Sequence, residues 1–136
     1  MTKTCVQGFL DNLKELLTDS NPMVVANSMA ALTEIDSVTE NGIDFEMNFS
    51  MVMKMLTALQ ECSEYRLNVV SVTKQGRIRW GQTYLLDSLL LYNPQEASEA
   101  ETIAERVAPR LFHGNGAVVL SSVKVNFFFF FFFILF

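Results

Sequence analysis

The chain has 136 residues, of which half are hydrophobic, and its formal net charge is −5. This length allows one domain with a core of its own. The acidic balance argues against a nucleic-acid partner, because neutralising phosphates takes clustered Lys and Arg.

The Cys and His content excludes the common zinc sites. Structural zinc needs about four ligands, whereas the sequence offers only Cys5, Cys62 and His113. We therefore expect no metal and no cofactor, and we interpret both cysteines as small buried residues in a reducing compartment. The N-terminal sequence MTKTCVQGFLDNLKELL has acidic residues and helical spacing where a signal peptide would have an unbroken apolar core.

The N-terminal region predicts two antiparallel helices joined by a tight turn. Apolar residues of the first helix recur at i, i+4, i+7 and i+8, the spacing of one amphipathic stripe: Phe9, Leu13, Leu16 and Leu17. In the turn TDSNP, Ser20 or Asn21 can cap a second helix whose first turn holds Pro22, because a proline there gives up no hydrogen bond. The second helix is predicted to bury one side: Val25, Met29, Leu32 and Ile35.

The middle of the chain predicts a loop and a second helix pair. The polar segment SVTENGIDFEMN, residues 37–48, breaks the helical period and predicts a connecting loop. Helical spacing then resumes: Val52, Met55, Leu56 and Leu59. After an interruption, WGQTYLLDSLLLY, residues 80–92, predicts a helix that is apolar nearly all round and therefore buried between neighbours.

The C-terminal region predicts a third pair. The segment NPQEASEAE leads into a fifth helix with its own apolar stripe: Ala100, Ile103, Ala104, Val107 and Leu111. Pro109 lies inside this stripe and should bend the helix, since an interior proline removes a hydrogen bond and clashes with the preceding turn. HGNG, residues 113–116, predicts a turn, and AVVLSSVKV begins a sixth helix.

An internal repeat links the first and third pairs. The segment LTDSNPMVVANS, starting at Leu17, matches LFHGNGAVVLSS, starting at Leu111, at an offset of 94 residues. That offset corresponds to two repeats of 47, or of about 39.5 when residues 65–79 are left out, and paired-helix repeats are about 40–47 residues long. Such pairs stack into a solenoid whose long surfaces bind other proteins; the alternative is an ordinary six-helix globular bundle.

At the same positions the chain resembles the beta-adaptin family, the large beta subunits of clathrin adaptor complexes. The similarity covers most of residues 6–125, apart from the loop near Asn41 and the segment 65–79. It is carried, in this order, by the runs NPMVVAN, ALQECSE joined to WGQ, RVAPRL and AVVLSSVKV.

The resemblance implies an all-α, HEAT/armadillo-like solenoid of about three helix pairs, which acts as a scaffold and is not an enzyme. It implies a role in vesicle-mediated intracellular protein transport, including endocytosis, with a second large, a medium and a small adaptor subunit as partners. The location would be cytoplasmic and peripheral on coated membranes of the trans-Golgi, endosome or plasma-membrane coated pits. The family's clathrin-binding hinge is absent from this sequence, so direct clathrin binding is not expected. Two alternatives stay open: an independent helical-repeat binding module, and a non-functional fragment from an incorrect gene model.

We expect residues 1–125 to form a fragment of the adaptin N-terminal trunk. Residues 65–79 would be an atypical insertion, because the family passes directly from a glutamate like Glu64 to a tryptophan like Trp80. Residues 126–136 would be a low-complexity, Phe-rich tail outside the fold and an aggregation liability, since seven consecutive phenylalanines leave no polar face. As a helix, residues 127–136 would span about 15 Å, too short to cross a bilayer core of roughly 30 Å. Our hypothesis is that both segments come from retained intron or an incorrect gene model.

The sequence predicts no catalytic, cofactor-binding or metal-binding residue. His113 has no serine, cysteine or acid pair arranged near it and is predicted to be an exposed turn residue, and its turn HGNG lacks the strand and lysine of a phosphate loop. Cys62 is predicted to be buried rather than nucleophilic. Trp80 and Tyr84 are predicted to pack between repeats.

Two further groups have simple structural interpretations. Four carboxylates near one helix start are explained by the helix dipole and by solvation: Glu96, Glu99, Glu101 and Glu105. Of four closely spaced methionines, Met55 belongs to an apolar stripe and is predicted to lie in the core. No specific site is predicted at the other three: Met47, Met51 and Met53.

Overall fold

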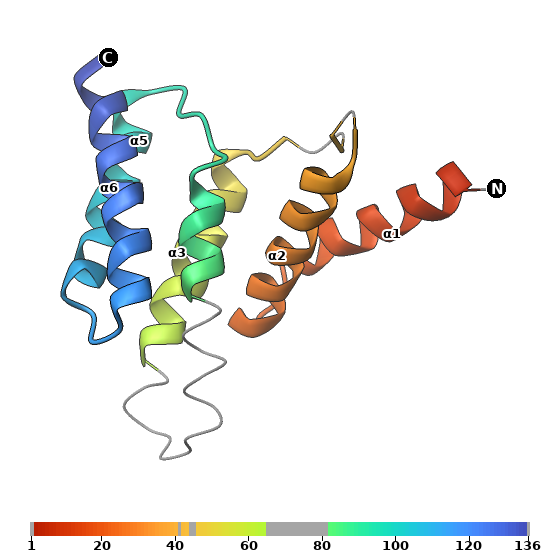
Figure 1. The fold of residues 1–136 in the computed structure, drawn as a ribbon, viewed down its shortest axis with the longest axis horizontal. Coiled ribbons are helices and arrows are strands. Elements are labelled where there is room, and N and C mark those ends of the chain that lie inside the picture. The colour runs from red at the N-terminus through yellow and green to blue at the C-terminus, as the bar shows by residue number, and fades with distance from the viewer. Residues whose placement is uncertain (1, 41, 44–45, 65–81, 136) are drawn as a thin grey trace.

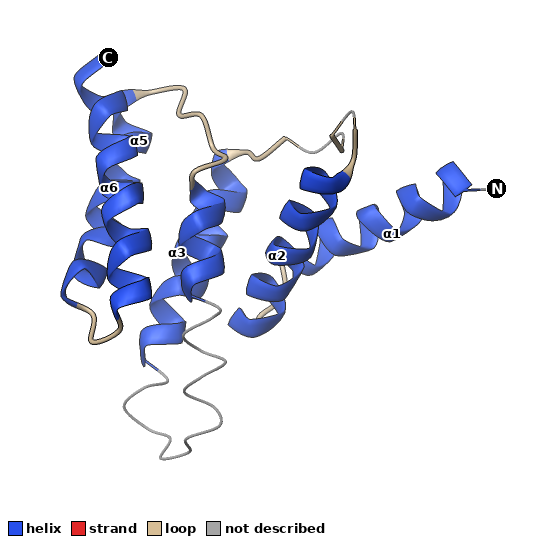
Figure 2. Cartoon of the chain, viewed as in Figure 1, coloured by secondary structure: helices blue, strands red, loops and turns tan. Residues whose placement is uncertain are grey.

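The computed structural model describes residues 2–40, 42–43, 46–64 and 82–135. The helices are α1 (Thr2–Leu16), α2 (Pro22–Val38), α3 (Phe49–Glu64), α5 (Ala97–Val107) and α6 (Gly116–Leu135), with a 3-10 helix η1 (Ala108–Phe112). Residues 82–89 are also helical. Within these ranges the chain consists of helices and connecting loops without a strand (Figure 2), which confirms the predicted all-α class.

The helices stack in layers along one direction, as predicted for a helical-repeat fragment. Figure 1 shows α1 beside α2, α3 beside the segment 82–89, and α5 beside α6. Contacts between elements follow the same order: α1 with α2, α2 with α3, α3 with α5, and α5 with α6. Each layer therefore covers the apolar side of the next, which is how a solenoid builds its core.

The core is one continuous cluster that runs through all three layers. The apolar stripes predicted for the second and third helices are confirmed, because their members are nearly all inaccessible to solvent: Val25, Met29, Leu32, Val52, Met55, Leu56 and Leu59. Ile35 packs against this cluster from a half-buried position. In α5, Ala100, Ile103 and Val107 are fully buried, as predicted.

The first helix turns a different side to the core from the one predicted. Leu13 and Leu17 are buried as expected, but Leu10 is buried in place of Phe9, which is 54% exposed, and Leu16 is 41% exposed. The observed stripe has the spacing i, i+3 and i+7, an equally good helical period. Spacing alone could not decide which side of the helix is buried, because apolar residues lie on both the predicted side and the observed side.

Asparagine caps begin the second helix of the first and third layers. Asn21 precedes α2, and its side chain accepts a hydrogen bond from the backbone N of Met23 at 2.9 Å, with proline in the first turn as predicted. Asn115 precedes α6 and accepts from the backbone N of Ala117 at the same distance. The two caps lie 94 residues apart, so the internal repeat recurs as local geometry.

A buried serine marks each of the three layers. Ser28, Ser88 and Ser122 are each less than 5% exposed. Each hydroxyl donates to the backbone carbonyl four residues earlier, at 2.7, 2.6 and 2.7 Å, respectively. This bond satisfies a polar group that packing would otherwise leave unpaired. The serine extends the repeat to the middle layer, where the sequence comparison had found no match.

Pro109 ends an α-helix rather than bending one. The α5 helix stops at Val107, and residues 108–112 continue as the 3-10 helix η1 with the proline in its first turn. A proline is tolerated there because the first N–H groups of a helix have no internal partner. The predicted bend is therefore replaced by a change of helix type.

The C-terminal residues differ most from expectation. We expected residues 126–136 to lie outside the fold, but α6 continues through Leu135, with Phe129 fully buried and Phe128 and Phe132 packed against the core. Adding residues to an existing helix gains one hydrogen bond for each residue fixed, and one side of this helix is buried against the core. The absence of a polar face was therefore no obstacle.

The same extension changes the membrane argument. The helix Gly116–Leu135 has 20 residues and is long and apolar enough, by length and composition alone, to cross a membrane, whereas residues 127–136 on their own would be too short. Core helices of soluble proteins also pass this test. Only 28% of its most apolar 18-residue window is buried against the rest of the chain.

The helical segment 82–89 buries one side and exposes the other. Leu85, Leu86 and Leu89 are inaccessible, but Tyr84 is 46% exposed and does not pack between repeats as predicted. Trp80 lies outside the described residues. The segment was expected to be buried nearly all round, and the middle layer instead leaves its outer side open to solvent.

Candidate interaction surfaces

Two hydrogen bonds fix the third layer to the second. Arg110, in η1, is only 8% exposed, and its Nη2 donates to the backbone carbonyl of Leu59 at 2.7 Å. Beside it, Nη2 of Arg106 donates to Oε1 of Gln60 at 3.4 Å. Both acceptors lie in α3, so a buried guanidinium and a surface one join the same two layers. The sequence analysis missed Arg110, although an arginine within an apolar stripe is a signal that it has a buried partner.

A groove of about 400 Å³ lies between the α1–α2 turn and α3. Its apolar floor includes Leu17, Val25 and Ala58, and its rim carries Lys54 and Glu61. The rest of the lining is small and polar, with one further methionine: Thr18, Asp19, Ser20, Ser50, Met53 and Thr57.

Three of the polar side chains around this groove are hydrogen-bonded to the backbone. Oδ1 of Asp19 accepts from the backbone N of Asn21 at 2.7 Å. The hydroxyl groups of Thr18 and Thr57 donate to the carbonyls of Glu15 and Met53 at 2.8 and 2.9 Å. These local bonds order the α1–α2 turn on one side of the groove and Thr57 on the other, so the groove presents a contact surface.

His113 is held in its turn by a backbone hydrogen bond. Its Nδ1 accepts from the backbone N of Asn115 at 3.0 Å, and the ring is half-buried rather than exposed. The turn prediction holds, but the predicted exposure was wrong, because the ring folds back over the start of α6. The imidazole therefore takes part in ordering the cap of that helix.

The four carboxylates in and next to α5 do not share one role. Glu99 accepts from the hydroxyl of Tyr92 and from the backbone N of Gln95, both at 2.8 Å. Burial by itself would raise the pKa of Glu99, but these hydrogen bonds, together with a backbone bond at Glu96, lower it. Burial and the neighbouring carboxylate raise the pKa of Tyr92 to about 12.

The hydrogen bond between Tyr92 and Glu99 joins the end of the middle layer to the first turn of α5. The Tyr92 ring is 4% exposed and lies 6.3 Å, centroid to centroid, from the ring of Phe49 in α3. Glu96, Glu101 and Glu105 are exposed, which agrees with the predicted solvation. The dipole interpretation is wrong for Glu105, because this residue lies in the last turn of α5, where the helix dipole disfavours a carboxylate. The Tyr92–Glu99 contact is therefore a structural clamp.

The methionines divide between core and surface. Met55 is buried as predicted, and Met47 is also buried, at 8% exposure. Met51 and Met53 are half-buried, and Met53 lines the groove beside α3. The side chains of Cys5 and Cys62 lie outside the described ones, so their predicted burial stays a prediction. No cluster of three or more His, Cys, Asp or Glu side chains suited to a metal occurs in the described parts of the chain.

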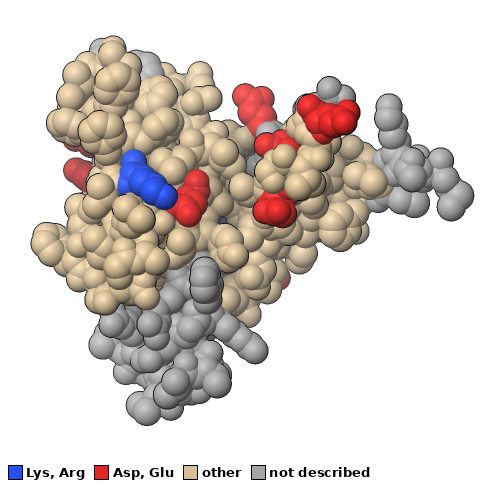
Figure 3. All heavy atoms as spheres, viewed as in Figure 1, with Lys and Arg blue, Asp and Glu red and all other residues tan. Residues whose placement is uncertain are grey.

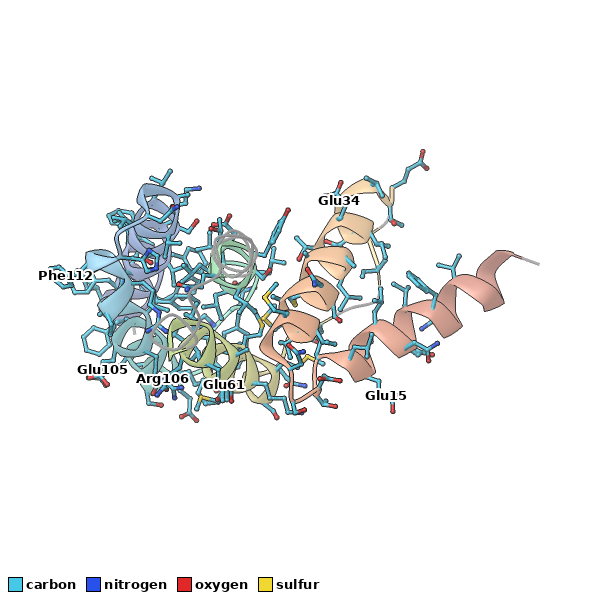
Figure 4. The ribbon with its side chains drawn as sticks, turned by 90° about the horizontal axis from the view of Figure 1, so that it is seen from below. Glu15, Glu34, Glu61, Glu105, Arg106 and Phe112 are labelled. Carbon is cyan, nitrogen blue, oxygen red and sulfur yellow. The ribbon has the colours of Figure 1, made fainter. Side chains whose placement is uncertain are left out.

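Charge is sparse on the face seen in Figure 3, where acidic side chains gather over α2 and one basic side chain lies beside an acidic one near the middle. In Figure 4, Glu15, Glu61 and Glu105 project along one edge of the molecule from α1, α3 and α5, and Arg106 lies next to Glu105. We call this the charged edge. Successive layers thus present charged groups along a common edge, as a solenoid does.

Comparison with known proteins identifies relatives of this chain. Over 119 residues the chain is 50% identical to the AP-1 complex subunit beta of Dictyostelium discoideum and 49% identical to the AP-1 complex subunit beta-1 of Homo sapiens, covering 88% of this chain and 11% of each relative. Over 120 residues it is 40% identical to the AP-2 complex subunit beta of Schizosaccharomyces pombe, covering 87% of this chain and 15% of the relative. Residues 2–127 match the family model described as non-SMC mitotic condensation complex subunit 1. The chain belongs to that family, and it matches a fragment of a beta-adaptin.

The predicted resemblance to beta-adaptins is therefore confirmed. The chain spans about a ninth of the length of the AP-1 beta subunits that it matches. The residues matched by the family model, 2–127, extend through all three layers.

Proposed function

We propose that this chain serves as a rigid segment of scaffold in the beta subunit of a clathrin adaptor complex, acting in vesicle-mediated intracellular protein transport. The observation that carries the proposal is the 40–50% identity to adaptor beta subunits over nearly the whole chain. The family description names a condensation complex subunit, but the proposal follows the relatives, because identity at about half of 119 positions is a residue-by-residue likeness.

The structure suggests how such a segment would work. Stacked layers joined by a continuous core and by the Arg110–Leu59 bond hold the groove and the charged edge at fixed spacings. Partner chains would then bind to surfaces whose geometry is set before they arrive, which lowers the entropy cost of association. No bond is made or broken in this role, and we propose no catalytic residue.

The proposed partners are the other adaptor subunits: a second large, a medium and a small chain. The location would be the cytoplasmic face of coated membranes, reached through the assembled complex. We also propose that residues 1–125 correspond to the adaptin trunk, and that residues 65–79 have a separate origin in retained intron or an incorrect gene model. Transcript reads that cross the Glu64–Trp80 junction as continuous coding sequence would reject that origin.

A chimera tests the scaffold role directly. In the human AP-1 beta-1 subunit, the homologous stretch would be replaced by residues 6–64 joined to 80–125 of this chain. Tagged chimera would be purified from cells lacking the endogenous beta subunit. We expect the other adaptor subunits to co-purify in the same proportions as with the unaltered human subunit.

The matched control keeps the chimera but replaces Met29 by Asp. Met29 is fully buried between the first two layers, and a buried unpaired charge should break the stack and abolish co-purification. A soluble chimera that recovers no adaptor subunit would overturn the proposal and favour an independent binding module.

A further inference from the structure

The outer side of α6 carries an apolar stripe that no described part of the chain covers. Its five members recur at intervals of three, four, three and four residues and are 48–74% exposed: Leu120, Val123, Phe127, Phe130 and Ile134. This alternation is the spacing with which one α-helix presents a continuous seam to another helix. We call these five residues the outer stripe.

The fold does not use the outer stripe. The opposite side of α6 packs against α5 and the core through residues that are fully buried: Val118, Ser122, Val125 and Phe129. Those residues have nearly the same spacing, so α6 has two apolar sides and only one is covered. The edge-to-face contacts of Phe128 with Phe129 and Phe132, at 5.1 and 4.9 Å, keep the inner rings in place.

The uncovered area is large enough for a stable interface. Three more side chains flank the outer stripe and are 45–67% exposed: Phe131, Phe133 and Leu135. Since a phenylalanine side chain offers roughly 150–250 Å², the four phenylalanines among these eight, at 45–74% exposure, expose on the order of 500 Å², and the four aliphatic side chains add to this area. A standard protein interface buries about 800 Å² on each partner, and a patch of this size exceeds what a monomer ordinarily leaves in water.

The absence of charged residues from the outer stripe favours an apolar partner surface. The outer stripe contains no charged residue, and the only charged residue of α6 is Lys124. An uncharged seam needs an equally uncharged one opposite it, because burying an unpaired charge costs far more than apolar contact gains. The outer stripe of another copy meets this requirement and has the same helical spacing.

We propose that the outer stripe is a dimer interface in which α6 packs against α6 of a second copy of this chain. Such an interface is two-fold symmetric, so it closes on itself and leaves no stripe free for further copies. A membrane is the less suitable occupant, because a helix crossing the bilayer would have to withdraw Phe129 and its buried neighbours from α5.

Light scattering after size-exclusion chromatography of the full 136-residue chain tests this. We expect a mass of twice 15.4 kDa for the wild type. The double variant Phe127→Glu with Phe130→Glu should be monomeric, with dimer affinity weakened at least roughly hundredfold. The matched control is Phe112→Glu, the same change at a phenylalanine that is 91% exposed and points away from the body in Figure 4; it should remain dimeric.

Four results would overturn the proposal: a monomeric wild type, a double variant that still dimerises, species of no definite mass, or a monomer that floats with neutral phosphatidylcholine vesicles. Far-UV circular dichroism shows whether the double variant keeps its helices. The substituted side chains are mostly exposed in the monomer, so helix content should be unchanged. Should the double variant unfold, Val123→Lys, at the edge of the seam, repeats the test with a milder change.

Discussion

Because Phe129 is fully buried, replacing it tests directly whether the phenylalanine-rich segment belongs to the folded body. Replacing a fully buried phenylalanine by alanine removes its apolar contacts and leaves a cavity, which costs about 3–5 kcal/mol. Domains of this kind have total stabilities of about 5–15 kcal/mol. We therefore expect Phe129→Ala to lower the melting temperature by roughly 10–20 °C.

The assay is thermal unfolding followed by far-UV circular dichroism at equal protein concentrations. Phe112→Ala is the matched control, since Phe112 lies in η1, is 91% exposed and belongs neither to the outer stripe nor to the side chains that flank it. It should cost less than about 1 kcal/mol. Equal, small losses for both variants would refute the packing of residues 126–135 against the core.

Three other substitutions test single contacts. Arg110→Met removes the donor to the Leu59 carbonyl and should lower the free energy of unfolding in urea by about 1.5–3 kcal/mol. Tyr92→Phe removes the bond to Glu99 at a similar cost. Thermal melts across pH test the same pair in the wild type. Since the pKa of Tyr92 is raised from 10.0 to about 12, its stabilisation is complete below pH 10.0 and lost as pH rises toward 12. The lowered pKa of Glu99 gives stabilisation above its ordinary value of 4.5 that is lost as pH falls below it. Asn115→Ala removes the cap of α6 and should cost about 1 kcal/mol in the same urea assay.

Each of these has a control on the surface or in the repeat. Arg106→Met removes only a 3.4 Å surface contact and should change stability by less than about 0.5 kcal/mol. Glu101→Gln alters an exposed carboxylate and should leave the acid limb of the pH profile intact. Asn21→Ala should cost as much as Asn115→Ala, because both caps bond the amide two residues on. The assigned contacts would be contradicted by an Arg106→Met variant as costly as Arg110→Met, by a Glu101→Gln variant that alters the acid limb, or by unequal costs at Asn21 and Asn115.

Local chemistry accounts for what the sequence predicted well. The helix stripes around Met29 and Leu56 and the cap at Asn21 depend on neighbours within four residues, so the one-dimensional pattern contains the information needed. The Arg110 bond to Leu59 joins groups 51 residues apart. No local pattern could have identified that carbonyl as the acceptor, since it depends on how two layers stack.

The larger misses share a cause as well. Phe9 and Leu10 are both apolar, and only the position of α2 decides which one is buried. The phenylalanine run was predicted to lie outside the fold, because a helix without a polar face was assumed to need other parts of the protein packed around its whole circumference. One side of α6 packs on α5 and the core, and this burial depends on how the layers stack, which no local pattern contains.

The serines at 28, 88 and 122 have a consequence for how such a chain could lose a layer. Each hydroxyl bonds to its own helix and needs no partner in the next layer, so these three serines impose no polar match between layers. The Arg110–Leu59 bond is a contact that does impose one, between the second and third layers. Loss of a whole layer would leave the remaining serines satisfied, whereas loss of the second layer would leave the buried guanidinium of Arg110 without its carbonyl acceptor.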